Sequence, residues 1–383
     1  MLRIGMLTSG GDCQALNAAM RGVVKGICSK VEDVEIFGFQ DGYKGLIYGD
    51  FKMLTSRDFS GILTRGGTIL GTSRQPFKLM RVPDKDGLDK VEAMKHTYHK
   101  LSLDCLVILG GNGTQKTANL LREEGLNVIG LPKTIDNDLP ITDHTPGFGS
   151  AAKYIASSIK EVLCDGRGFA NTPIVTIIEI MGRNAGWLTG AAALAKTGDC
   201  EGVDLIYLPE VAFDTKEFVE EVREIMKKKS TVFVAISEGI RTADGTYISE
   251  MGGGSDYVDA FGHKQLAGSA TYLANLIGSE LGCKTRGIEF STLQRCASHM
   301  ASLTDINEAF MAGAAAVKAA DEGETGKMPV IERVSDYPYR TSTSVYDIHK
   351  IANVEKMVPR EWINEKGNGV TEDFIRYARP LIQ

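Results

Sequence analysis

A short polar segment carries the residue types that a phosphoryl-transfer site needs. Residues 132–138, with the sequence PKTIDND, follow the apolar run 127–131, where a buried strand is expected to end. Lys133 can neutralise phosphate charge. One of the two carboxylates, Asp136 or Asp138, can accept a hydroxyl proton, and the other can bind Mg²⁺. An Asp-rich turn that caps a helix has the same composition, so the segment alone leaves both interpretations open.

Two glycine-rich loops strengthen the phosphate interpretation. Residues 9–12 (SGGD) follow the β-type run 2–8, residues 110–114 (GGNGT) follow the run 106–109, and a helical pattern begins after each loop. Glycines let backbone N–H groups approach a phosphate at the positive end of a helix. Either loop alone could be a tight connection, but three such loops after strands predict a phosphate site at the carboxyl edge of a sheet.

The composition of the chain limits the classes of protein and partner. The chain has 383 residues, 43% of them hydrophobic, and 43 glycines, which suits two cores and the tight loops of an α/β protein. The net charge of −6 argues against a nucleic-acid partner or an anionic membrane surface. No apolar run reaches 18 residues and the chain starts with a strand pattern, so we expect neither a membrane span nor a signal peptide.

The cysteines indicate a reducing, cytoplasmic environment. The seven cysteines are scattered and form no CxxC pair, which argues against a disulfide framework and a zinc site. Cys13 lies in the first glycine loop, but no base is near it in sequence, and we expect an unreactive thiol.

Strand and helix patterns alternate along most of the chain. Strand patterns are found near residues 2–8, 33–39, 104–109, 127–131, 174–180, 203–208, 231–237 and 284–290. This alternation predicts an α/β protein of two αβα lobes with mainly parallel sheets. Residues 138–149 are predicted to cross from the first lobe to the second, and the polar stretch 322–345 to form surface connections.

Several motifs, in this order and spacing, resemble those of the 6-phosphofructokinases. They are residues 7–12 with 17–22, 66–74, 110–114, 132–138, 179–183, 237–239 and 294–295. The resemblance implies a phosphofructokinase-like fold with a phosphoryl-donor lobe (residues 1–147 plus about 295–345) and a sugar-phosphate lobe (residues 148–294 plus about 346–383). In that family one phosphate-binding arginine comes from a neighbouring subunit, which implies a homodimer or homotetramer.

The resemblance also assigns roles residue by residue. Asp136 would be the base for the C1 hydroxyl of fructose 6-phosphate, Thr134 would position the groups around it, and Arg183 would stabilise the transferring phosphoryl. The implied catalytic set is Asp136, Thr134, Arg183, Lys133 and Gly113. The implied donor-binding set is Gly11, Tyr43, Arg74, Gly111, Asn112, Gly113 and Thr114.

On the sugar side, Glu238 would hydrogen-bond the substrate, while Arg286 and Arg295 would bind its 6-phosphate. The implied substrate-binding set is Thr134, Asp136, Met181, Gly182, Arg183, Glu238, Arg286, Thr292 and Arg295. The cofactor would be Mg²⁺, held by Asn112 and Asp138. A planar arginine fork matches phosphate oxygens, which agrees with these roles.

Two positions give opposite indications about the donor. In the family, glycine at the position of Gly113 leaves room for the α-phosphate of ATP, whereas aspartate marks the pyrophosphate users. Lys133 is typical of the pyrophosphate enzymes, although some longer ATP enzymes carry it, and residues 143–150 and 294–299 also resemble that branch. We interpret the chain as an ATP-using member close to the pyrophosphate-dependent branch, with pyrophosphate use as the alternative.

Departures from the family pattern leave further alternatives. Asn112 replaces a metal-binding aspartate of the ATP enzymes, so Asp138 would carry more of the metal. On the substrate side Thr292 replaces a histidine or tyrosine and Cys296-Ala297 a glycine pair, so sedoheptulose 7-phosphate is an alternative sugar. The same departures suggest a catalytically silent regulatory subunit, against which the retained Asp136, Arg183 and Lys133 argue. NAD kinases and lipid kinases share the second glycine loop but would not explain residues 132–138. His144 is expected to be a turn residue.

Overall fold

The computed structural model describes residues 1–84, 86–168, 172–252, 266, 268–351 and 354–383. These residues form two compact units, Met1–Ser150 with Arg295–Lys356 and Ala151–Gln294 with Met357–Gln383. The sequence predicted that the chain passes between the two lobes after residue 147, before about residue 295 and after about residue 345. The first division falls inside helix α5 (Phe148–Arg167), and the last comes after residue 356.

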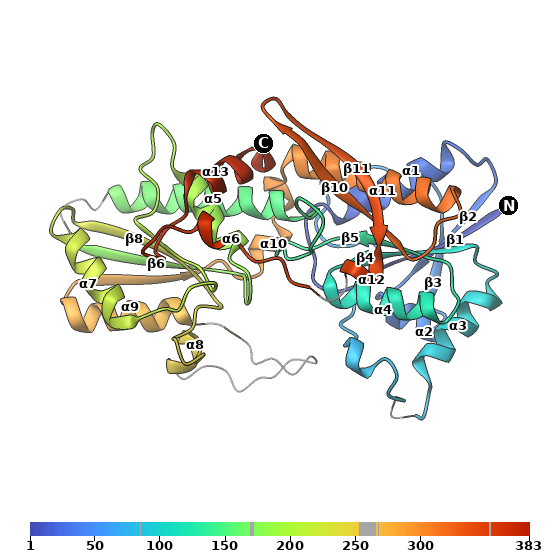
Figure 1. Ribbon diagram of the computed structural model, residues 1–383, viewed down its shortest axis with the longest axis horizontal. Coiled ribbons are helices and arrows are strands. Elements are labelled where there is room, and N and C mark those ends of the chain that lie inside the picture. Colours follow the sequence, from blue (N-terminus) through green and yellow to red (C-terminus); the bar gives the residue numbers. More distant parts are fainter. Residues whose placement is uncertain (85, 169–171, 253–265, 267, 352–353) are drawn as a thin grey trace. The chain divides into compact units, whose positions relative to one another are not determined.

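The first unit contains a seven-stranded sheet, shown in Figure 1. Its strands, in spatial order, are β11 (Tyr339–Asp347), β10 (Lys327–Asp336), β5 (Val128–Pro132), β4 (Cys105–Gly110), β1 (Leu2–Thr8), β2 (Val34–Phe39) and β3 (Phe51–Leu54). The central strands are parallel, and antiparallel pairs, β2–β3 and β10–β11, close the two edges. The central strands β4 and β5 are buried throughout and rich in Val, Ile and Leu, as expected for strands covered on both faces.

The register of this sheet brings the polar loops to one edge. Thr8 at the end of β1 lies opposite Leu109 of β4, and Gly110 at the end of β4 lies opposite Pro132 of β5. The strands that precede the two glycine loops and the PKTIDND segment therefore end level with one another.

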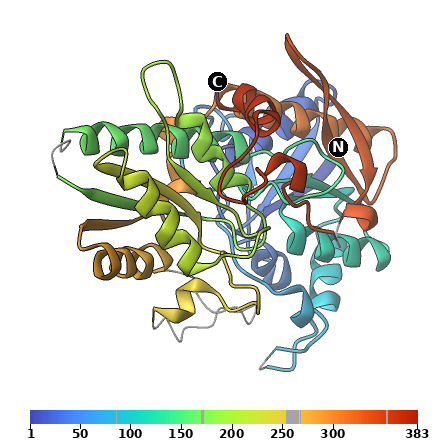
Figure 2. The ribbon, with the colours of Figure 1, turned by 60° about the vertical axis from the view of Figure 1, so that its left-hand side comes forward.

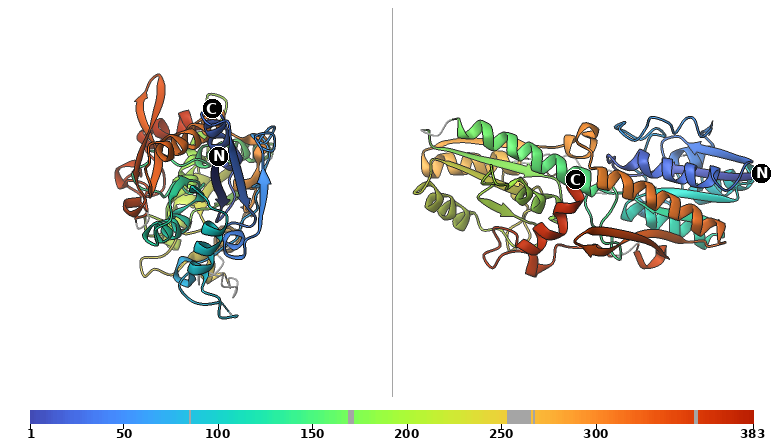
Figure 3. Two further views of the ribbon diagram at one scale, coloured as in Figure 1. Left: turned by 90° about the vertical axis from the view of Figure 1, so that its right-hand side faces the viewer. Right: turned by 90° about the horizontal axis from the view of Figure 1, so that it is seen from above.

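Helices cover both faces of the first sheet (Figure 1). They are α1 (Leu16–Cys28), α2 (Tyr43–Tyr48), α3 (Lys90–Lys100), α4 (Asn112–Glu123), α11 (Leu303–Asp321) and α12 (Ile348–Ile351), with short 3₁₀ turns at Phe77–Leu79 and Ser298–Met300. Figure 3 shows α1 and α11 side by side. A Cβ at Gly22 would lie 2.2 Å from the carbonyl oxygen of Phe310, and one at Gly313 would lie 2.2 Å from that of Ala19. Glycine is therefore required for this close backbone contact.

The second unit contains a smaller sheet of four parallel strands. Their order is β7 (Leu205–Tyr207), β8 (Thr231–Ser237), β6 (Ile174–Ile180) and β9 (Lys284–Glu289). Figure 2 shows α5 along one face and α9 (Ser269–Leu281) along the other, and Val175, Val234 and Leu273 contribute to a buried apolar core. Further helices of this unit are α6 (Trp187–Gly190), α7 (Thr215–Met226), α8 (Ile248–Met251) and α13 (Glu372–Ala378), with 3₁₀ turns at Ala191–Ala195, Arg360–Trp362 and Arg379–Ile382. The division between the units falls inside α10 (Leu293–Cys296).

One expectation about the chain's organisation is wrong. The stretch 322–345 does not form surface connections, because most of it belongs to the paired strands β10 and β11. The buried part of these strands is the short run Met328–Ile331, which contains Pro329, and the remaining strand residues are mostly polar and at least partly exposed. A proline and a weak apolar signal hid these strands from sequence analysis. Among the described residues, no helix combines the length and apolar character needed to cross a membrane.

Candidate active site

The loops that follow β1, β4 and β5 meet at one edge of the first sheet. The backbone N–H of Ser9 donates to the carbonyl of Leu109 at 2.9 Å, and that of Lys133 donates to the carbonyl of Gly110 at 3.2 Å. A Cβ at Gly111 would lie 3.7 Å from the Cβ of Thr134. The structure therefore brings together the three loops that the sequence predicted to converge.

Lys133 places a buried positive charge beneath the first glycine loop. Its side chain is 3% exposed, and its Nζ donates to the carbonyl oxygen of Gly11. A Cβ at Gly10 would lie 3.8 Å from this Nζ, and one at Gly11 would lie 3.5 Å from Nη1 of Arg295. Burial lowers the pKa of Lys133, and the nearby Asp12 acts in the opposite direction. Two cationic side chains thus surround the backbone of this loop.

Thr134 and Asp136 form a reciprocal hydrogen-bonded turn. The Thr134 hydroxyl donates to Oδ2 of Asp136 at 3.2 Å, and the backbone N–H of Asp136 donates to the Thr134 Oγ1 at 3.1 Å. Burial raises the pKa of Asp136, whereas Thr134, Lys133 and Arg295 act to lower it. A carboxylate with these opposed influences is suited to accept a proton at a phosphate site.

Asp138 adds a second carboxylate in an unfavourable charge environment. Burial raises its pKa to about 7, and the negative charges of Asp136 and Glu355 contribute further. Among the described residues, Oδ1 of Asp138 and Oδ1 of Asn112 are buried and have no hydrogen-bond partner. Such oxygens suit a hard divalent cation. The described residues contain no cluster of three or more His, Cys, Asp or Glu side chains that could hold a metal, so two protein ligands would leave positions for phosphate oxygens and water.

The second glycine loop is shorter than expected from the sequence. Gly110 ends β4, Gly111 is the N-cap, and residues 112–114 already form the first turn of α4, where backbone N–H groups are free of intrahelical partners. A Cβ at Gly110 would lie 2.4 Å from Thr114, whereas a Cβ at Gly113 would meet nothing within 4 Å. Open space thus surrounds Gly113 at a helix N-terminus suited to an anion.

Two other predicted donor-binding residues have different surroundings. Tyr43 is buried under the second loop, where its hydroxyl donates to the Thr114 carbonyl at 2.8 Å and supports the loop. Its assignment to donor binding stays a prediction. Arg74 has an exposed side chain next to the first loop, where the Thr72 hydroxyl donates to the carbonyl of Gly10 at 2.7 Å.

In the second unit, the loops after β6 and β8 bring predicted sugar-binding residues together. The backbone N–H of Gly182 donates to Oε1 of Glu238 at 3.3 Å. Gly182 has φ +137°, and a Cβ at Gly239 would lie 1.9 Å from the carbonyl oxygen of Arg183, so this loop contact requires glycine. Met181, Gly182, Arg183 and Glu238 therefore form a second cluster, at the carboxyl edge of the smaller sheet.

Three further predicted sugar-binding residues lie on or next to other elements. Arg286 lies within β9, and its Nη1 donates to Oδ2 of Asp165 at 3.0 Å. Thr292 is exposed just before α10. Arg295 belongs to the first unit, where its guanidinium lies near Gly11. The proposed joint binding of one phosphate by Arg286 and Arg295 stays a prediction.

Sequence analysis missed three contributors to these clusters. Asp12 has a buried Oδ1 without a partner among the described residues, and burial raises its pKa. Glu355 affects Asp138 from a distant, polar part of the chain, and no local signal marked it. Gln294 accepts a hydrogen bond from the N–H of Met181 at 3.0 Å. The Cys13 thiol is buried and its pKa is raised by burial, in agreement with the expected unreactive thiol.

Comparisons with known proteins agree on one family. The family profile described as Phosphofructokinase matches residues 3–320. The chain is 36% identical to a pyrophosphate–fructose 6-phosphate 1-phosphotransferase of Halomonas elongata, covering 98% of this chain and 90% of the relative. It is 42% identical to an ATP-dependent 6-phosphofructokinase of Spirochaeta thermophila, and the match covers 85% of this chain and 86% of the relative. The crystal structure of a pyrophosphate-dependent phosphofructokinase from Nitrosospira multiformis matches with a TM-score of 0.88 at 30% identity. The match covers 100% of this chain and 92% of that one. The fold, the clustered site residues and these matches together show that the chain is a member of the phosphofructokinase family of enzymes.

Proposed function

We propose that this enzyme transfers the terminal phosphoryl group of ATP to the C1 hydroxyl of fructose 6-phosphate, giving fructose 1,6-bisphosphate. The observation that carries the proposal is the cluster of Lys133, Thr134, Asp136 and Asp138 at the carboxyl ends of β4 and β5. Family membership supports the reaction class, and the relatives named above act on fructose 6-phosphate or are named for it.

In the proposed mechanism the protein positions groups and neutralises charge. Asp136 accepts the proton of the attacking hydroxyl, while Thr134 fixes the orientation of its carboxylate. Lys133 neutralises phosphate charge at the first glycine loop, and Arg183 stabilises charge on the transferring phosphoryl. Asp138 and Asn112 would hold Mg²⁺, which when bound neutralises donor phosphate oxygens.

The choice of ATP as donor depends on Gly113. Open space at its missing side chain supports room for a nucleotide α-phosphate beside the first turn of α4. Lys133 and the similarity to pyrophosphate-dependent relatives favour the second candidate, a pyrophosphate-dependent phosphotransferase. Because relatives of both kinds match at comparable identity, the steric argument at Gly113 decides our preference.

On the sugar side, we propose that Glu238 hydrogen-bonds fructose 6-phosphate and that arginines bind its distal phosphate. In the family that the chain belongs to, one phosphate-binding arginine comes from a neighbouring subunit, so we propose that the active enzyme is a homodimer or homotetramer, and that it is cytoplasmic. Exposed Thr292 leaves room for a longer sugar, so sedoheptulose 7-phosphate is the alternative acceptor.

A donor and acceptor screen of the purified chain tests the proposed function. The native protein is assayed with Mg²⁺, with ATP or pyrophosphate as donor, and with fructose 6-phosphate or sedoheptulose 7-phosphate as acceptor. We expect the highest kcat/KM with ATP and fructose 6-phosphate. No turnover with any pair would favour the regulatory-subunit alternative, and a preference for pyrophosphate would favour the second candidate.

A further inference from the structure

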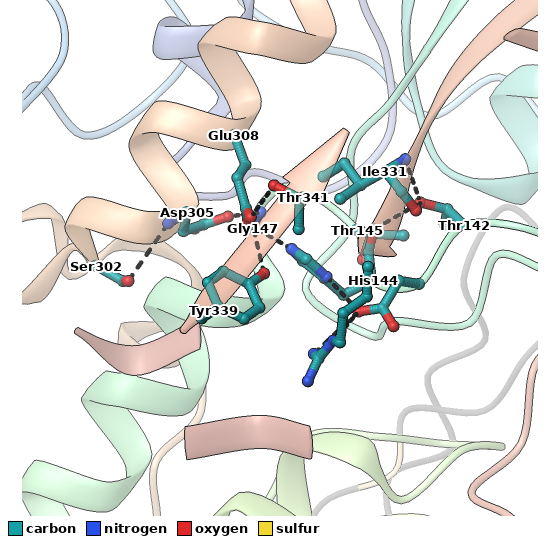
Figure 4. A network of polar contacts seen from close by, with 12 residues as sticks. Thr142, His144, Thr145, Gly147, Ser302, Asp305, Glu308, Ile331, Tyr339 and Thr341 are labelled. Carbon is teal, nitrogen blue, oxygen red and sulfur yellow. Dashed lines mark hydrogen bonds and ion pairs between the residues drawn. The ribbon is translucent and has the colours of Figure 1, made fainter. Parts of the chain in front are cut away.

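His144, which the sequence marked only as a turn residue, is buried between two carboxylates (Figure 4). Its Nδ1 lies 2.7 Å from Oδ1 of Asp143, and its Nε2 lies 2.6 Å from Oε2 of Glu308 in α11. Ionised carboxylate oxygens only accept hydrogen bonds, and a neutral imidazole has a single N–H. Both contacts can be hydrogen bonds at once only when both ring nitrogens carry a proton.

The partners of the two carboxylates tie several elements to this imidazole. Oδ1 of Asp143 also accepts from Nη2 of Arg333 in β10 at 3.0 Å. Oε1 of Glu308 accepts from the hydroxyls of Tyr339 and Thr341 in β11, both at 2.8 Å. Figure 4 shows these side chains converging from α11, the two strands and the loop. Of these partners, only the histidine approaches Oε2 of Glu308.

Charged side chains from several elements face this cluster. The anionic ones are Asp143, Asp305, Glu308 and Asp336, which come from the loop, α11 and β10. The cationic ones are Arg333 in β10 and Lys356 in the segment after α12. Tyr339 completes the titratable groups, and its pKa is raised by burial and by Glu308. Burial acts to lower the pKa of His144, but the hydrogen bonds to the two carboxylates outweigh it and raise that pKa above its ordinary value.

The backbone next to His144 holds the proposed catalytic turn. Thr145 donates through its N–H to Oδ1 of Asn137 at 3.1 Å and through its hydroxyl to the carbonyl of Thr134 at 2.9 Å. These two acceptors lie on either side of Asp136 in the chain. The N–H of Gly147 donates to Oδ1 of Asp305 at 2.8 Å. A displacement of the loop at His144 would therefore move the turn that carries Asp136.

We infer that His144 is a positioning residue, held as an imidazolium, that fixes the Thr134–Asp138 turn to α11 and the β10–β11 pair. The inference rests on the proposed function of Asp136 and Asp138 in phosphoryl transfer. Loss of the ring proton would set a nitrogen lone pair against a carboxylate oxygen and loosen the loop. Because each ring nitrogen faces a carboxylate oxygen, the ring holds its proton to a higher pH than an ordinary histidine, and kcat should fall as rising pH removes that proton.

The protonation state can be measured without any activity assay. NMR of the native protein labelled with ¹⁵N-histidine reports whether Nδ1 and Nε2 each carry a proton, and comparison with His144→Gln or Glu308→Gln assigns the signal among the six histidines. We expect His144 to be doubly protonated at pH 7.5. We also expect Glu308→Gln, which keeps the size of the side chain and removes its charge, to lower the pH at which His144 titrates. A neutral ring at pH 7.5 in the native protein would overturn the inference.

Kinetics separate a positioning role from a merely structural one. His144→Gln keeps a donor but cannot carry charge, so we expect kcat to fall about 10- to 100-fold while the donor KM changes less than about twofold. The alkaline fall of kcat that we expect of the native enzyme should be absent from the variant. His96→Gln, the same substitution at an exposed position of α3, is the matched control and should behave as the native enzyme does.

The outcomes of these experiments are distinguishable. A His144→Gln enzyme with native kcat and an unchanged alkaline limb would overturn the positioning role. If that variant does not fold, NMR titration of the native protein and of Glu308→Gln still decides the protonation state of His144. The kcat of Glu308→Gln should then fall at a lower pH than the kcat of the native enzyme. A native chain inactive with both donors would remove the proposed function, whereas a neutral His144 in an active chain would contradict this inference alone.

Discussion

The two units hold their predicted site residues in different ways. In the first, Lys133, Asp136 and Asp138 lie on one loop, and burial or neighbouring charge shifts the pKa of each side chain. In the second, Gly182 and Glu238 come from loops after two different strands and are joined through backbone groups that require glycine. The comparison suggests that proton transfer and charge neutralisation depend on the first cluster, whereas recognition of the sugar depends on the second. Variants of the two clusters should therefore fail differently.

The largest effect is expected at Asp136. Asp136→Asn preserves shape and the acceptor for Thr134 but removes the base, so kcat should fall by roughly 10²–10⁴-fold. The melting temperature should change little or rise, because a buried charge is lost. Steady-state kinetics and thermal unfolding of the same preparation check both points, and near-native turnover would remove Asp136 from the role of base.

A recognition residue should give a smaller effect of another kind. Arg286→Ala would remove the charge-assisted hydrogen bond that we propose to the sugar phosphate, which should raise the sugar KM by about 10- to 100-fold and leave the donor KM nearly unchanged. Arg295→Ala is the comparison, because its guanidinium lies near Gly11 in the first unit. If Arg295→Ala raises the donor KM instead of the sugar KM, its assignment to the sugar phosphate is wrong.

Asp138 links metal binding to pH. Its pKa of about 7 means that the carboxylate is protonated progressively below that pH, so the apparent KM for Mg²⁺ should rise toward tenfold per pH unit between pH 7 and 6. In Asp138→Asn this pH dependence should disappear. Kinetics as a function of Mg²⁺ at several pH values measure it, and a native KM for Mg²⁺ that is flat over this range would contradict the assignment.

The same raised pKa predicts an opposite effect on stability. The folded carboxyl holds its proton more tightly than the unfolded one, so the metal-free protein gains stability from this group as pH falls below about 7. Asp138→Asn removes a buried charge and its repulsion by Asp136 and Glu355, so the melting temperature of the metal-free protein at pH 8 should rise by roughly 2–4 °C for each kcal/mol gained.

Tyr43 should give the smallest effect. Tyr43→Phe removes only the hydrogen bond to the carbonyl of Thr114, which should lower the free energy of unfolding by about 0.5–1.5 kcal/mol and leave the donor KM within about twofold. Denaturant unfolding and the donor KM measure the two quantities. A large rise in the donor KM at unchanged stability would instead support a direct contact between Tyr43 and the donor.

The sequence predicted the parts of this molecule that depend on local pattern. Strands ending in SGGD, GGNGT and PKTIDND indicated parallel sheets and a phosphate edge, and the first unit has this arrangement. The strands β10 and β11 escaped prediction because only a short, proline-containing part of them is buried. Glu355 and the contact between His144 and Glu308 escaped because they join residues far apart in the chain and have no periodic signal.

The donor is tested most directly at Gly113, where the two lines of sequence evidence disagree. Gly113→Asp puts a carboxylate into space that no described atom fills, while Gly113→Ala fills the same space without charge and serves as the matched control. The measurement is kcat/KM for ATP and for pyrophosphate with fructose 6-phosphate and Mg²⁺. We predict that the native and alanine enzymes use ATP and that the aspartate enzyme loses ATP use and gains pyrophosphate use, because like charges repel strongly in a partly dry site. A native enzyme that prefers pyrophosphate, or a Gly113→Asp enzyme that still uses ATP, would contradict the account.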